Sequence, residues 1–259
     1  MCLLAIQYQL VPDSPVLVAA NREERYDRPS SPPSIQSGKP RALCGVDQEA
    51  GGTWLGVNQH GMFVAACNRR KWDLPPNPLS RGVLCRELLR AGSAREAADR
   101  AVEELTTGNY NGVNYICADG DSGWVVHGGD DINVAEIHQG LSIIANSDVN
   151  DPKDERVSLA RRLLTLQTLD SPVKFLAVAS KVFARPPSPE GRPTIIVRKA
   201  EVGTVSSTLI SLGKKPRDAI YQFAPGAPDR TRYEDYSPLL RDILSRGLRE
   251  SQLKAAKAS

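Results

Sequence analysis

Aromatic side chains and an excess of either charge are both scarce in this 259-residue sequence. Phe, Trp and Tyr together make up 5% of the residues, and 33 Lys and Arg against 30 Asp and Glu leave a formal net charge of +3. Nucleic-acid binders need concentrated cations for phosphates and aromatic faces for stacked bases. The composition therefore argues against a nucleic acid as a partner.

Long apolar runs are also missing. No stretch approaches the roughly 20 apolar residues that a membrane span requires, and the first ten residues, MCLLAIQYQL, lack the basic start and apolar length of a secretory signal. We therefore expect no membrane span and a cytoplasmic location.

Cysteine and histidine are few and scattered. The five cysteines form no CxxC pair, and the histidines at positions 60, 127 and 138 show no metal-ligand spacing. The pattern predicts neither a disulfide framework nor a metal site, and no cofactor. Haem ligation by one of the histidines stays open as an alternative.

Alternating apolar residues predict strands, and pairs of helical patterns interrupt them. Because the helices come in pairs and not as single crossovers, the order favours an α+β fold of antiparallel sheets covered by helices. We expect one domain over residues 1–259 whose C-terminal helix frays at its charged end. Strands are predicted at 3–10, 16–20, 43–46, 53–57, 62–66, 114–118, 123–127, 133–137, 141–145, 194–199, 206–212 and 220–223, helices at 80–91, 93–105, 151–169, 171–184 and 238–258, and Pro-rich loops at 29–38 and 185–193.

Cys2 is the first candidate for chemistry. Removal of Met1 would leave its thiol beside a free α-amine, whose pKa near 7.7–8.0 suits a base at neutral pH. A nucleophile activated by the N-terminal amine is an established arrangement. The alternative is that Cys2 is a small residue that opens a strand.

The segment Asn21-Arg22-Glu23-Glu24, with three charged residues, follows the second predicted strand. If the first two strands form a hairpin, its open end brings this segment close to Cys2. Arg22 could then lower the pKa of a thiolate, and Glu23 could orient the amine or Arg22. The alternative is a solvated, charged strand end.

Several asparagines stand at predicted strand ends. A side-chain amide can stabilise the oxyanion of a tetrahedral intermediate, although Asn is also common in turns. Asn68 and Asn146 each end an apolar run, which would place them at the edge of a sheet. The full group is Asn58, Asn68, Asn111, Asn114 and Asn146.

An ordered set of motifs resembles the NRDE family, also called the transport and Golgi organisation protein 2 family. The resemblance spans residues 2 to about 237 and implies the fold of N-terminal nucleophile hydrolases, a four-layer αββα sandwich of two antiparallel sheets flanked by helices. The motifs are Met-Cys at the start, ANREE at 20–24, GGTWLG at 51–56, YNGVN at 110–114, ANS at 145–147 and GTVSST at 203–208.

A more distant resemblance, to choloylglycine hydrolases and penicillin V acylases, implies site residues. Segment 58–68 resembles the part that supplies one oxyanion donor, and segment 145–147 resembles the part that supplies a further active-site asparagine. The resemblances imply a site with catalytic Cys2, Arg22, Glu23, Asn68 and Asn146, and with binding residues Asn21, Trp54 and Asn114.

Two departures from the family pattern stand out. Glu23 replaces an Asp, which moves the carboxylate by one methylene, and Val205 stands where the family often has Arg. No catalytic role is carried onto position 205.

The candidate residues and the resemblances imply two functions, each with a small-molecule substrate or ligand as the partner. The first is a cysteine amidohydrolase in which Cys2 attacks a non-peptide C–N bond or a thioester. The alternative is a non-enzymatic protein on the same fold that binds and moves haem, a lipid or acyl-CoA.

Overall fold

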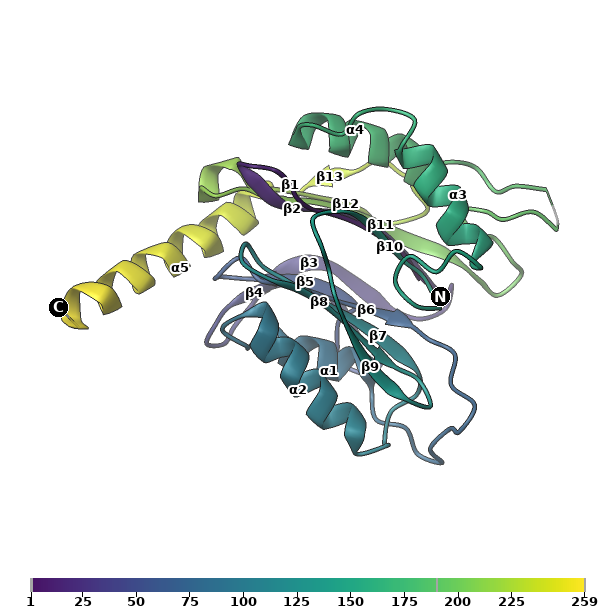
Figure 1. The fold of residues 1–259 in the computed structure, drawn as a ribbon, viewed down its shortest axis with the longest axis horizontal. Helices are drawn as coiled ribbons and strands as arrows, with labels where there is room; N and C mark the ends of the chain where they lie inside the picture. The colour runs from purple at the N-terminus through teal and green to yellow at the C-terminus, as the bar shows by residue number, and fades with distance from the viewer. Residues whose placement is uncertain (1, 190, 259) are drawn as a thin grey trace.

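A computed structural model describes residues 2–189 and 191–258, and it stacks two antiparallel β-sheets face to face (Figure 1). The first sheet has the strand order β10-β1-β2-β11-β12-β13, and the second runs β3 to β9 in sequence order. The strands of the first sheet are β1 (Cys2–Val11), β2 (Ser14–Arg25), β10 (Gly140–Ile144), β11 (Val202–Leu212), β12 (Ile220–Ala224) and β13 (Glu234–Asp235). Those of the second are β3 (Ser30–Gln36), β4 (Ala42–Asp47), β5 (Leu55–Asn58), β6 (Phe63–Asn68), β7 (Val113–Ala118), β8 (Gly123–Gly128) and β9 (Ile132–Glu136).

Helices cover the outer face of each sheet (Figure 1). The pair α1 (Arg81–Leu88) and α2 (Ala94–Thr106) packs on the second sheet, and the pair α3 (Glu155–Leu164) and α4 (Pro172–Phe183) packs on the first. Each of the four begins after a Ser or Asp whose side chain caps the first turn. The αββα sandwich implied by the family resemblance is therefore confirmed, and α5 (Ser237–Ala258) runs outward from it.

Alternation along β1 and β2 decides which side chains face the other sheet. Leu4, Ile6 and Tyr8 belong to the core between the sheets, whereas Leu3 and Ala5 belong to the core beneath α3 and α4. Even-numbered positions of β1 thus point inward. Cys2 continues this series and packs against the core between the sheets.

Two sequence predictions were wrong. Residues 29–38 were expected to be a loop, but Ser30–Gln36 forms edge strand β3, whose register with β4 shifts between Ser31 and Ser34. Prolines are tolerated in an edge strand at such an irregularity. Residues 194–199 were expected to be a strand, but they contain only an isolated bridge between Arg198 and Gly203.

The helices were also searched for membrane spans. Within residues 2–189 and 191–258, none of them combines the length and the apolar character that crossing a bilayer demands.

Candidate functional site

The β1–β2 hairpin places Cys2 directly opposite Arg22. Both side chains belong to the inner face of the first sheet, as the alternation requires. The guanidinium of Arg22 is buried, lies 4.4 Å from the ring centre of Trp54 and approaches Glu24 at 3.8 Å. A positive charge is thereby held next to the thiol.

The thiol of Cys67 reaches Cys2 from the opposing sheet. Cys67 lies on β6, and both cysteines line a small void between the sheets. The hydrogen bond that Cys67 donates lowers the pKa of Cys2 to about 5, while burial opposes the shift and the backbone N–H of Glu23 and the charge of Arg22 add to it. The same contact raises the pKa of Cys67 well above its ordinary value. The pair therefore favours a thiolate on Cys2.

Sequence reasoning missed Cys67 as a site residue. It sits at the end of an apolar run, where a free cysteine is typical of a small buried side chain. The one signal was its position beside Asn68, which had been selected as a strand-end residue.

Glu23 is buried and forms an ion pair with α3. Its carboxylate accepts hydrogen bonds from both terminal nitrogens of Arg156, one at 3.0 Å. Arg156 also donates to the main-chain carbonyls of Thr194 and Ile195. These carbonyls belong to the segment 194–199, where the predicted strand does not form. Burial raises the pKa of Glu23, and Arg156 opposes that shift. Glu23 thus joins β2 to the helix layer behind the nucleophile.

The two asparagines expected to bind ligand hold backbone segments in place. Asn21 donates to the carbonyl of Phe183 at the end of α4, 3.0 Å away. Asn114 donates to the carbonyls of Ala145 and Ser147, and its side-chain oxygen lies 2.8 Å from Nδ1 of His127. Asn114 thereby fixes the loop that carries Asn146.

Asn68 and Asn146 come together at the end of β6. The side-chain amide of Asn146 donates to the main-chain carbonyl of Asn68 at 2.6 Å. Asn68 lines the same cavity as Cys2, whereas Asn146 lines a neighbouring hollow with Arg69 and Asp148. The structure therefore puts Asn68 in the wall of the Cys2 cavity and Asn146 outside that wall, in contact with Asn68.

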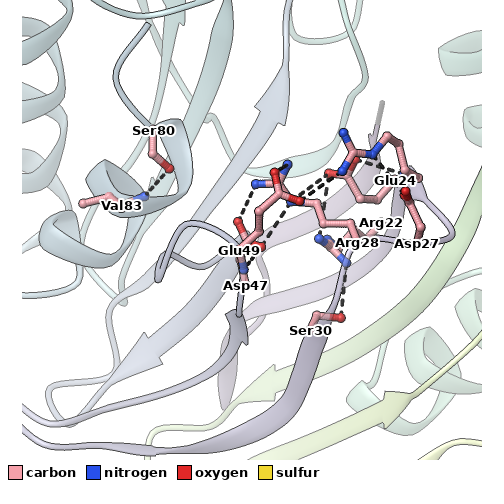
Figure 2. A network of polar contacts seen from close by, with 10 residues as sticks. Arg22, Glu24, Asp27, Arg28, Ser30, Asp47, Glu49, Ser80 and Val83 are labelled. Atoms are coloured by element: carbon pink, nitrogen blue, oxygen red, sulfur yellow. Dashed lines mark hydrogen bonds and ion pairs between the residues drawn. The ribbon is translucent and has the colours of Figure 1, made fainter.

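A cavity of about 230 Å³ opens beside Cys2. One wall is a polar network in which Arg28 forms a two-pronged ion pair with Asp47 and approaches Glu24 (Figure 2). Figure 2 also shows Ser80 and Val83, at the start of α1, across from this network. The lining residues are Cys2, Arg22, Glu23, Glu24, Arg28, Asp47, Ala50, Thr53, Trp54, Ala66, Asn68, Pro78, Leu79, Ser80, Arg81, Gly82 and Asn111. Asn111 belongs to the group of strand-end asparagines selected from the sequence. No sequence pattern indicated that Arg28 or Arg81 would join this wall, because they reach it from a loop and from the start of a helix.

Histidines stay away from this cavity. His127 is buried against Asn114, and His60 lies in a different cavity next to Leu244. Among the residues that the structure describes, no cluster of three or more His, Cys, Asp or Glu side chains could hold a metal ion.

Comparison with known families gives one match that covers most of the chain. The sequence model of the family described as "Transport and Golgi organisation 2" matches residues 1–218. A curated mouse protein, "Transport and Golgi organization 2 homolog" (Mus musculus), is 33% identical over 127 residues, and a human "Transport and Golgi organization protein 2 homolog" is 31% identical over 126 residues. Each alignment covers 46% of this chain and 45% of the relative, so the match spans less than half of either protein.

Two solved structures have a similar fold. A penicillin V acylase from Agrobacterium tumefaciens superposes with a TM-score of 0.53 at 13% identity, covering 93% of this chain and 88% of that one. An N-acylethanolamine-hydrolyzing acid amidase ortholog from Caenorhabditis elegans gives a TM-score of 0.52 at 14% identity, covering 81% and 92%. At these identities the similarity establishes the fold alone.

Proposed function

The chain belongs to the Transport and Golgi organisation 2 family, and from this premise we propose that it is a cysteine amidohydrolase. In this proposal Cys2 attacks a non-peptide C–N bond or a thioester. The observation that carries the proposal is the lowered pKa of the Cys2 thiol together with its position at a cavity. The thiol is hydrogen-bonded by Cys67, lies opposite Arg22 and borders a cavity large enough for a substrate head group.

The proposed reaction uses the thiol and the α-amine of the same residue. Removal of Met1 exposes the amine, which carries the proton that the thiol has lost. The thiolate attacks the carbonyl carbon, the C–N bond breaks, and the ammonium gives its proton to the departing nitrogen. Water then attacks the resulting thioester and gives a proton to the amine. The C–S bond breaks, the carboxylic acid leaves, and the thiolate and the ammonium are restored.

Asn68 is the candidate donor to the oxyanion. It lines the Cys2 cavity from the end of β6, and a side-chain amide aimed at a developing negative charge lowers the barrier. Asn146 is assigned a positioning role, because its own amide is already directed at the carbonyl of Asn68.

A carrier of haem or lipid is the competing function. The first measurement therefore screens N-acyl amino acids, N-acyl lactams and acyl-CoAs for hydrolysis, and a haem titration is run beside it. Wild type is compared with Cys2→Ala and with Cys117→Ala, a buried cysteine that does not line the Cys2 cavity.

Turnover that disappears in Cys2→Ala and persists in Cys117→Ala supports the amidohydrolase. No turnover of any compound, together with saturable haem binding that Cys2→Ala leaves unchanged, would refute the enzyme and support the carrier.

Retention of Met1 is a separate test of the mechanism. Intact-mass analysis of the natively expressed protein should show a chain that begins at Cys2, because an uncleaved Met1 turns the proposed base into an amide. A population that keeps Met1 in full contradicts the mechanism.

A further inference from the structure

Arg81 is a cation in the cavity wall that lacks a carboxylate partner. It is the first residue of α1 and is half-buried. Its Nη1 donates to the main-chain carbonyl of Gly112 at 2.9 Å. Within the part of the chain that the structure describes, it forms no ion pair.

The carboxylates near the cavity are already matched with other cations. Asp47 holds Arg28, and Glu24 lies 3.8 Å from Arg22 and 3.9 Å from Arg28. The charge of Arg81 nevertheless acts within this site, because it interacts electrostatically with both Cys2 and Glu24. Among the residues that the structure describes, the cavity thus contains one guanidinium, that of Arg81, without a carboxylate in direct contact.

Asn111 lines the same cavity and precedes Gly112, whose carbonyl accepts the hydrogen bond from Arg81. The backbone beside Asn111 therefore holds the Arg81 guanidinium at the cavity wall.

We propose that Arg81 binds an anionic group, a carboxylate or a phosphate, on the molecule that enters the Cys2 cavity. The guanidinium has five N–H donors, and a planar anion can take two of them at once. The ligand class is therefore an acyl compound whose amide or thioester faces Cys2 and whose other end is negatively charged. This assignment rests on the proposed function, which makes the cavity the meeting point of substrate and nucleophile.

The test measures binding and does not depend on turnover. Full-length Cys2→Ser protein is titrated by calorimetry with N-octanoylglycine and with its neutral analogue N-octanoylglycinamide. N-octanoyl-O-phosphoethanolamine forms the phosphate arm, with N-octanoylethanolamine as its neutral analogue. Because hydrogen bonds between charged groups strengthen binding, we expect the protein to bind each anion about 10- to 100-fold more tightly than its neutral analogue.

Arg81→Gln, made in the same Cys2→Ser background, should remove this preference. Arg86→Gln is the matched control, because Arg86 lies on the same helix, donates to a main-chain carbonyl at 2.8 Å and does not line the cavity. It should keep the preference. The tighter of the two anions identifies the group as carboxylate or phosphate.

Three results would overturn the assignment: equal affinity for charged and neutral compounds, a preference that survives Arg81→Gln, or no binding of any compound. Failure of the proposed function is distinguishable from these. A wild-type protein that hydrolyses nothing but shows the Arg81-dependent preference refutes the hydrolase and supports the anion site. Hydrolysis without any charge preference refutes the anion site alone.

Discussion

The thiols of Cys2 and Cys67 approach each other from different sheets, and this contact lowers the pKa of Cys2. The shift in the pKa of Cys2 to about 5 depends first on the hydrogen bond from Cys67. A thiolate is the reactive form of cysteine. Cys2 should therefore be in its reactive form throughout the neutral pH range.

Cys67→Ala should raise the pKa of Cys2 toward its ordinary value. The wild-type protein should be alkylated by iodoacetamide at a nearly constant rate between pH 6 and 8, because the thiol is already ionised. In Cys67→Ala the rate at pH 6 should fall by roughly tenfold or more and should rise with pH. Peptide mapping of Cys2 reads the rate, and Cys117→Ala serves as the control. An unchanged pH profile in Cys67→Ala would contradict this origin of the shift.

Asn68→Ala should slow turnover of any substrate identified for the proposed reaction. Removal of one oxyanion donor typically lowers kcat by about 10²–10³. Alkylation of Cys2 should stay close to the wild-type rate, because the amide acts on the transition state and not on the thiol. Asn77→Ala, an exposed asparagine in the loop after β6, is the control. Loss of alkylation and turnover together would indicate a damaged site and would count against the oxyanion role.

At the scale of single elements, the β1–β2 hairpin was predictable. Its alternation and its Pro-containing turn required Cys2 and Arg22 to come close together, and the register pairs them directly. The approach of Cys67 was not predictable, because no local pattern states which residues of two separate sheets will face each other. The Pro-rich edge strand β3 was missed for a related reason, since pairing with β4 outweighs its weak strand propensity.

The two departures from the family pattern are neighbours in the first sheet. Val205 is the extra residue at a register shift in β11, between Thr204 and Ser206, which pair with Glu23 and Arg22. A guanidinium nevertheless contacts Glu23 here, and it comes from Arg156 on α3. The sequence alone hid this arrangement, because Arg156 belongs to a basic stretch that is typical of a solvated helix face.

Arg156→Ala should strongly destabilise the protein. Removing one partner of a buried ion pair leaves the other charge uncompensated and typically costs about 3–5 kcal/mol. Chemical denaturation followed by circular dichroism measures the free energy of unfolding. Arg162→Ala changes an exposed arginine on the same helix and should stay within about 0.5 kcal/mol of wild type. Equal, small effects of both substitutions would show that the Glu23–Arg156 pair contributes little.

At the scale of the whole molecule, α5 is attached to the sandwich through a close backbone contact and then runs outward (Figure 1). A Cβ atom on Gly247 would lie 2.0 Å from the carbonyl oxygen of Gln59. The side chain of Gln59 also donates to Glu250, one turn further along the helix, at 2.7 Å. The helix can therefore dock in this position only with glycine at the contact.

Gly247→Ala should displace α5 and lower the free energy of unfolding by about 1–3 kcal/mol, the usual cost of overpacking. Thermal unfolding measures the effect. Gln252→Ala, at an exposed position of the same helix, should leave the melting temperature nearly unchanged. A Gly247→Ala protein as stable as wild type would mean that α5 shifts without cost.

The contact between Cys2 and Cys67 also makes the nucleophile latent in an unassembled chain. Each thiol belongs to its own sheet, so neither sheet alone can ionise Cys2 in this way. Before the sheets dock, the hydrogen bond from Cys67 is absent, so the pKa of Cys2 is higher and a smaller fraction of the thiol is ionised at neutral pH. Its reactivity should therefore rise when the two halves of the core close, and the increase in the alkylation rate during refolding times that event.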